Sequence, residues 1–303
     1  MKFGRVICPA LLVCLVSAAL PDLALAQVAG QQDGDIVVTG SLTPREQQVK
    51  NLSKVISQRP RMDKPVARQY REMCVAVTGL SADMGQQFLD RIASNALRLN
   101  LSFGKPGCVA NSVIIFTNDG KGQIEKLRKE GNWAFEPLFD YEYKRIFRGS
   151  GAAQVWHTTG VVGRDGREFS IMRMPDGSEV ALNKSPSATR LNDQIRTEIE
   201  GTVIIIDAKR SIGKTVPQLA DYASMRLFAS VDDVETVSGG SVPTILSLFA
   251  PQPFAPDGMT EFDWSYLTGL YRLPETAKGS AVHDAAVAAY RKAERAASEA
   301  TQK

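Results

Sequence analysis

The sequence has little histidine and almost no charge imbalance. Its 303 residues contain two histidines, His157 and His283, which lie far apart. This excludes a zinc site of the HExxH type. The 36 basic residues nearly balance the 33 acidic ones, and the net charge of +3 predicts no strong attraction to nucleic acid or to an anionic membrane. With 44% hydrophobic and 23% charged residues, the composition is that of a globular protein.

The first 26 residues are typical of an export signal. Lys2 and Arg5 give the amino-terminal region a positive charge, residues 6–20 form an apolar run, and residues 24–26 (Ala-Leu-Ala) form a cleavage site. The alternative is an uncleaved anchor, but the run is shorter than the ~20 residues that cross a bilayer. We therefore expect cleavage after Ala26, a periplasmic or secreted location and no transmembrane span in the mature chain.

Cleavage would leave two cysteines, Cys74 and Cys108, in the mature chain. An even pair in an oxidising compartment predicts a disulfide. In the chain-entropy treatment, a loop of about 35 residues closed in this way stabilises the fold by ~3–4 kcal/mol. Two free thiols are the alternative, and only then would a cysteine nucleophile be available to work with His157.

After the signal, the composition divides the chain into three parts. Residues 27–64 are predicted to be a flexible leader with a short amphipathic helix, because Thr43 to Glu46 form a capping box before apolar residues at helical spacing. Residues 65–275 are predicted to form one α+β domain, with helices packed on a mixed or antiparallel sheet. Residues 276–303 are rich in alanine and charge, which favours a surface or protruding helix.

Local patterns within the domain predict its elements. The expected strands are 75–77, 112–116 and 202–207, and the expected helices are 81–99, 123–129, 216–229 and 260–271. The run at 202–207 is continuously apolar, which predicts burial on both faces. Turn signals favour an antiparallel meander of residues 152–162, 168–174 and 179–182.

Aromatic and basic residues gather between positions 133 and 148. They are Trp133, Phe135, Phe139, Tyr141 and Tyr143, with Lys144, Arg145 and Arg148. Such a mixture suits a platform for an oligosaccharide or a nucleic acid. A helix that packs its aromatic face on the core and leaves a solvated basic end explains the same residues. We expect this second arrangement, and no nucleic-acid partner.

The segment Ala208 to Thr215 is similar to a loosened phosphate-binding loop. In that role Lys214 would contact phosphates and Thr215 would hold magnesium. The segment has a single glycine, and Pro217 removes an amide near the start of the following helix. We expect a basic surface turn, and nucleotide or phosphate binding at this loop remains a weaker alternative.

His157 is the first candidate for a hydrolytic site without a known motif. It lies in a predicted strand, where a histidine hydrogen-bonded through its ring is the more common arrangement. The serines near glycine, such as Ser150, lack the setting of a nucleophile elbow. The sequence therefore assigns no catalytic residue, no metal ligand and no cofactor.

Residues 241–271 resemble the C-terminal part of metzincin-type metalloproteases. The resemblance is carried by Ser-Val-Pro-Thr-Ile-Leu-Ser-Leu-Phe at 241–249, Met-Thr-Glu-Phe-Asp at 259–263 and Leu-Tyr at 270–271. It implies a zincin-like scaffold. The methionine of the family's Met-turn is replaced here by Ile245 or Leu246.

The same resemblance places the family's zinc helix at residues 218–222. Gln218 and Tyr222 would occupy the histidine positions and Leu219 the glutamate position. The resemblance therefore implies a scaffold without zinc ligands or a general base. Asp221 lies on the same helix, and we expect it to pair locally rather than to act in catalysis.

Two further resemblances concern the source. The chain resembles uncharacterised secreted proteins of sphingomonad-type alphaproteobacteria, with Gln-Leu-Ala-Asp-Tyr at 218–222. Residues 35–40 (Asp-Ile-Val-Val-Thr-Gly) resemble the segment after the signal in TonB-dependent outer-membrane receptors. Both imply a Gram-negative source, and neither implies an activity.

The resulting expectation is an exported, non-catalytic envelope or interaction protein on a metal-free zincin-like scaffold, with envelope proteins as partners. A periplasmic hydrolase with a site around His157 is the alternative from another class. Nucleotide or phosphate binding at Lys214 is the weaker alternative.

Overall fold

A computed structural model describes residues 42–58, 64–183, 194–234, 242–251 and 255–301. The expected export signal, the receptor-like segment at 35–40 and Ser241 lie outside these residues. Within the described ranges, no helix combines the length and the apolar character needed to cross a membrane.

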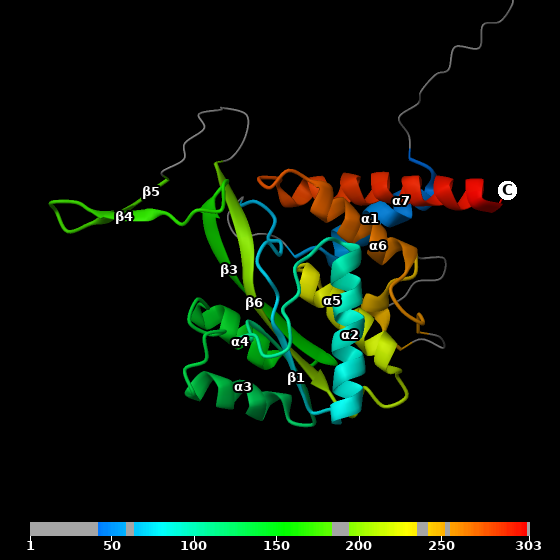
Figure 1. The fold of residues 1–303 in the computed structure, drawn as a ribbon, viewed down its shortest axis with the longest axis horizontal. Coiled ribbons are helices and arrows are strands. Elements are labelled where there is room, and N and C mark those ends of the chain that lie inside the picture. Colours follow the sequence, from blue (N-terminus) through cyan, green and yellow to red (C-terminus); the bar gives the residue numbers. More distant parts are fainter. Residues whose placement is uncertain (1–41, 59–63, 184–193, 235–241, 252–254, 302–303) are drawn as a thin grey trace, which may run out of the picture. The chain divides into compact units, whose positions relative to one another are not determined.

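A four-stranded mixed sheet forms the centre of the fold, in the strand order β1-β2-β6-β3 (Figure 1). β1 (Val75–Thr78), β2 (Ser112–Thr117) and β6 (Ile195–Asp207) are parallel, and β3 (Ala153–Gly163) runs antiparallel to β6. The predicted α+β class with a mixed sheet is confirmed.

Helices cover both faces of this sheet (Figure 1). They are α2 (Ala82–Arg98) and α5 (Val216–Phe228) on one face, and α3 (Gly120–Lys129) and α4 (Asp140–Arg148) on the other. In β6, Ile204 belongs to the first core and Ile205 to the second, because successive side chains of a strand point to opposite faces. The prediction that this strand is buried on both faces is confirmed.

The first and last described helices pack against each other. α1 (Pro44–Ile56) begins with the predicted capping box and contacts α7 (Gly279–Thr301), which also packs on α6 (Glu261–Arg272). Ion pairs join Glu46 to Arg291, and Lys50 to Asp284 at 2.7 Å. The alanine-rich C-terminal helix is therefore docked on the domain over its apolar stripe, which includes Val282 and Ala286. A single 3₁₀ turn, η1 (Ile245–Ser247), precedes α6.

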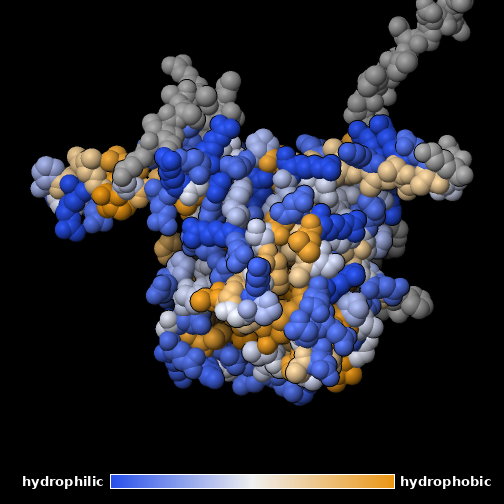
Figure 2. Space-filling model, in the orientation of Figure 1, coloured by the Kyte–Doolittle hydropathy of each residue, from blue (hydrophilic) through white to orange (hydrophobic). Residues whose placement is uncertain are grey.

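The predicted three-stranded meander is wrong in its first pairing, whereas its second and third strands do form an antiparallel hairpin. β3 pairs along its length with β6, whereas β4 (Ser170–Arg173) and β5 (Glu179–Leu182) pair only with each other. Turn signals report local reversals, but pairing with β6 allows Trp156 of β3 to join the second core. The β4–β5 hairpin exposes Ile171 and Met172, and apolar surface is visible along it (Figure 2).

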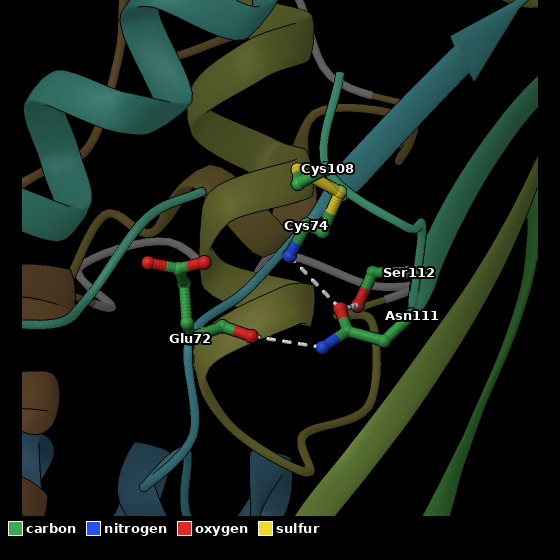
Figure 3. The surroundings of a disulfide bond; sticks show 5 residues. All are labelled: Glu72, Cys74, Cys108, Asn111 and Ser112. Atoms are coloured by element: carbon green, nitrogen blue, oxygen red, sulfur yellow. Dashed lines mark hydrogen bonds between the residues drawn. A yellow bond between two sulfur atoms is a disulfide. The ribbon is translucent and has the colours of Figure 1, made fainter. Parts of the chain in front are cut away.

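The predicted disulfide between Cys74 and Cys108 is present. It joins the residue before β1 to the loop between α2 and β2. Asn111 supports this junction: its side-chain oxygen accepts from the Cys74 amide at 3.0 Å, and its nitrogen donates to the Glu72 carbonyl at 2.8 Å (Figure 3). Disulfides of this kind are consistent with an exported protein.

Candidate functional site

A cleft of about 830 Å³ opens between α4, the start of β3 and the end of α5. Four cationic side chains line it, namely Lys144, Arg145, Arg148 and Arg226. We call it the basic cleft. Its volume lies within the range of roughly 300–1,000 Å³ that is usual for ligand sites.

Three of these cations come from α4. The helix is amphipathic: Ile146 faces the second core, whereas Lys144, Arg145 and Arg148 are exposed. Residues three and four apart lie on the same side of a helix, so Arg148 is close to both of the others. None of the three forms an ion pair with another described residue.

The fourth cation, Arg226, is buried in the cleft wall, with only 4% of its surface exposed. Its Nη1 donates to Asp233 at 2.8 Å, and the Tyr222 hydroxyl donates to the same carboxylate oxygen at 2.7 Å. Its buried Nε has no acceptor among the described residues. Burial by itself lowers the pKa of Arg226, but Asp233, Tyr222 and Asp232 outweigh it, so the net shift is upward and the side chain stays charged.

Positive charge dominates the basic cleft. Asp232 and Asp233 are its two carboxylates, against four cations. Both carboxylates already have partners, since Asp233 accepts from Arg226 and Asp232 accepts from the Gln58 amide at 2.7 Å. The remaining cations are therefore available to an anionic ligand, which they would hold by charge-assisted hydrogen bonds.

The aromatic residues near the cleft divide into two groups. Trp133, Phe135 and Tyr143 pack against the second core, which confirms the predicted structural role for these three. Phe139 and Tyr141 are instead 57% and 64% exposed and stack on each other, with ring centroids 5.7 Å apart. Because Tyr141 also lines the basic cleft, it offers a flat apolar surface beside the cations.

His157 lies in β3 opposite Thr202 of β6, with its Nδ1 2.9 Å from the threonine hydroxyl. Its Nε2 is buried and has no partner among the described residues. Burial, together with the nearby charge of Arg226, lowers the pKa of His157 to about 3. The imidazole is therefore neutral near pH 7, and its partner Thr202 is fully buried. This arrangement links two strands.

Asp221 is fully buried between α2, α5 and the segment before α6. It accepts from Arg91 at 2.7 and 2.8 Å, from the Asn95 amide at 2.7 Å and from the Met259 backbone at 2.9 Å. Four hydrogen bonds satisfy the carboxylate, which therefore joins three parts of the fold.

The segment Ala208 to Thr215 forms a turn and the beginning of α5. The Thr215 hydroxyl accepts from the Gln218 amide, and the Gln218 side chain accepts from the Thr215 amide. The Lys214 amide donates to the Ser211 carbonyl. Several of the groups that a phosphate-binding loop would direct at its ligand, among them the Lys214 and Thr215 amides, are used within the turn.

The positions that correspond to zinc ligands in the metzincin resemblance also have structural partners. Gln218 donates to the Pro256 carbonyl at 2.8 Å, Tyr222 donates to Asp233, and Leu219 is buried. Among the residues that the structure describes, no group of three or more His, Cys, Asp or Glu side chains is placed to hold a metal ion. His157 and His283 belong to different parts of the fold, in β3 and α7.

Sequence reasoning named the basic residues of α4 but missed Arg226 and Asp233. The available signal was a charged residue inside the otherwise apolar run Ser-Met-Arg-Leu-Phe at 224–228, where a buried cation needs a partner.

No protein-family model, no curated protein and no solved structure matches this chain.

Proposed function

We propose that this chain is an exported, non-catalytic binding protein of the cell envelope, which takes up an anionic ligand in the basic cleft. The observation that carries the proposal is the set of three exposed cations of α4, without ion pairs to described residues, that line an open cleft beside the buried Arg226.

The non-catalytic part of the proposal rests on the candidate residues themselves. The Asp221 carboxylate, the Thr215 hydroxyl and the Nδ1 atom of His157 are engaged in contacts within the fold. The metal-free zincin-like scaffold remains a hypothesis that rests on the sequence resemblance, with Gln218 and Tyr222 at the ligand positions.

Export and a periplasmic or secreted location are supported by the Cys74–Cys108 disulfide and by the sequence of residues 1–26. Mass spectrometry of protein recovered from an oxidising periplasm tests them. The expected mass is that of residues 27–303 less two hydrogens. The mass of the whole chain, or of a reduced one, contradicts this part of the proposal.

Calorimetric titration of the mature protein with citrate, tripolyphosphate and digalacturonate tests the cleft. We expect at least one of these anions to bind, and Arg145→Gln with Arg148→Gln to weaken binding at least tenfold. A matched control, Arg164→Gln with Arg272→Gln, removes the same charge from exposed positions outside the cleft. The proposal fails if none of the three binds, or if the cleft variant binds like the control.

A further inference from the structure

A second pocket, of about 530 Å³, lies beside the basic cleft, between the end of α1, α6 and the first turn of α7. Three lysines, Lys54, Lys64 and Lys278, line it, and none of its described lining residues is a carboxylate. We call it the lysine pocket. None of its lysines forms an ion pair with another described residue.

The positive potential of the lysine pocket has one further source. Gly279 and Ser280, the first residues of α7, line it, so the positive end of a long helix dipole faces the space. Burial and the charges of Lys54 and Lys50, opposed by Asp284, lower the pKa of His283 in the pocket wall.

Gln58 lines both the lysine pocket and the basic cleft. It follows α1, and its side-chain amide donates to Asp232 on the cleft side. The two cationic sites therefore meet at Gln58, a neutral side chain that is bonded to the exposed carboxylate of Asp232. A single extended ligand that crosses Gln58 can contact both.

The neutral side chains indicate which kind of polyanion fits. Ser150 in the basic cleft, and Ser230 and Ser280 in the lysine pocket, place hydroxyls among the cations. Tyr141 adds one exposed ring. Sugar rings offer hydroxyls to bond and a flat face to stack, whereas a nucleic-acid strand calls for a series of stacking rings for its successive bases. A bare phosphate chain could accept hydrogen bonds from the hydroxyls but would make no use of the ring.

We propose that the basic cleft and the lysine pocket together bind one acidic oligosaccharide, a chain of sugars that carries carboxylates at intervals and crosses Gln58. This inference rests on the proposed function and adds the ligand class and a second subsite. Because the second subsite binds a group already tethered in the first, affinity should rise steeply with chain length.

Calorimetric titration with galacturonate oligomers of one, two, four and eight units tests the inference. We expect the octamer to bind at least about tenfold more tightly than the dimer. Lys54→Gln with Lys278→Gln should bring the octamer down to the affinity of the dimer and leave dimer binding unchanged. Lys126→Gln with Lys129→Gln removes the same charge from exposed positions on α3. This control variant should still bind the octamer more tightly than the dimer.

Three other ligands complete the experiment. Neutral maltooctaose should not bind, which would show that the carboxylates are required. Octathymidylate and an eight-unit polyphosphate should bind more weakly than octagalacturonate, and tighter binding of either overturns the sugar assignment. The proposal of a second subsite is overturned if the dimer and the octamer bind with equal affinity. It is also overturned if the lysine-pocket variant still binds the octamer more tightly than the dimer, as the wild type does. If digalacturonate fails while tripolyphosphate binds in the cleft, this inference falls and the proposed function stands.

Discussion

The substitution Asp221→Ala separates a structural role for this carboxylate from a catalytic one. The side chain is fully buried and accepts four hydrogen bonds that join α2, α5 and Met259. Alanine removes the acceptor but leaves the donors in place. The cost then depends on which donors can return to water.

The magnitude follows from the exposure of each donor. Arg91 is 45% exposed, so its guanidinium can be rehydrated and its ion pair contributes little. Asn95 is buried and keeps only its bond to Ser224, at 3.0 Å. The Met259 amide loses its acceptor altogether. At roughly 1–3 kcal/mol for a buried group left unsatisfied, we expect Asp221→Ala to lower the free energy of unfolding by about 2–4 kcal/mol.

Urea unfolding followed by circular dichroism measures this loss. With a slope near the upper end of the usual ~1–3 kcal/mol/M, the midpoint should fall by about 1 M. Glu125→Ala, at an exposed position on α3, is the control and should stay within about 0.5 kcal/mol of the wild type. Catalytic residues often reduce stability, so their replacement can be neutral or stabilising. An Asp221→Ala protein as stable as the control would refute the structural reasoning.

Four further outcomes are expected. Replacing Cys74 and Cys108 by alanine should lower the free energy of unfolding by ~3–4 kcal/mol, and a reductant should then have no further effect in urea titrations. The pKa of His157, about 3 when folded, lies below its usual value, so the unfolded chain takes up the proton first as the pH falls. Relative to His157→Gln, the wild type should lose up to about 1.4 kcal/mol per pH unit below pH ~6.5, and parallel stability curves would contradict this. Lys214→Ala should change neither stability nor tripolyphosphate affinity, because Lys214 lines neither the basic cleft nor the lysine pocket; weaker tripolyphosphate binding would revive the phosphate-loop alternative. Gly269→Ala would place a Cβ 2.6 Å from a backbone carbon of α7 and should lower the thermal midpoint by an amount equivalent to about 1–3 kcal/mol, whereas an unchanged midpoint would show that the helices can separate without loss.

Features that depend on neighbouring residues in the sequence were predicted correctly. Thr43 and Thr260 cap helices at the positions that the sequence predicts. Successive residues of the apolar run 202–207 point alternately into the two cores. The disulfide followed from the cysteine count. These features depend on neighbours in the sequence or on composition, which a single chain displays directly.

Long-range pairing escaped prediction. β6 begins at Ile195, seven residues before its apolar run, because Glu198 is held there by Arg71 and Arg196. Polar residues at a strand's beginning look like a loop until their distant partners are known. For the same reason the sequence predicts that β3 pairs with the strand that follows it in the chain, whereas in the structure it pairs with β6.

The candidate site was predicted only in part. Arg145 and Arg148 stood out as a basic cluster, but Arg226 was hidden in a helix whose residues from Gln218 onward are all buried. A helix buried on every side must pair each charge that it carries, so Arg226 pointed to a partner such as Asp233. Which distant elements complete the cleft depends on the fold.

The pairing of α1 with α7 bears on when the protein can finish folding. Val49 and Ile56 lie in the same core as Val282 and Tyr290, although more than 200 residues of sequence separate them. Contacts this remote form late, because a long loop must close before they contribute. A chain emerging from its amino end would hold the apolar face of α1 uncovered until α7 arrives. We therefore expect the last step of folding to wait for α7, whose docking covers the apolar face of α1.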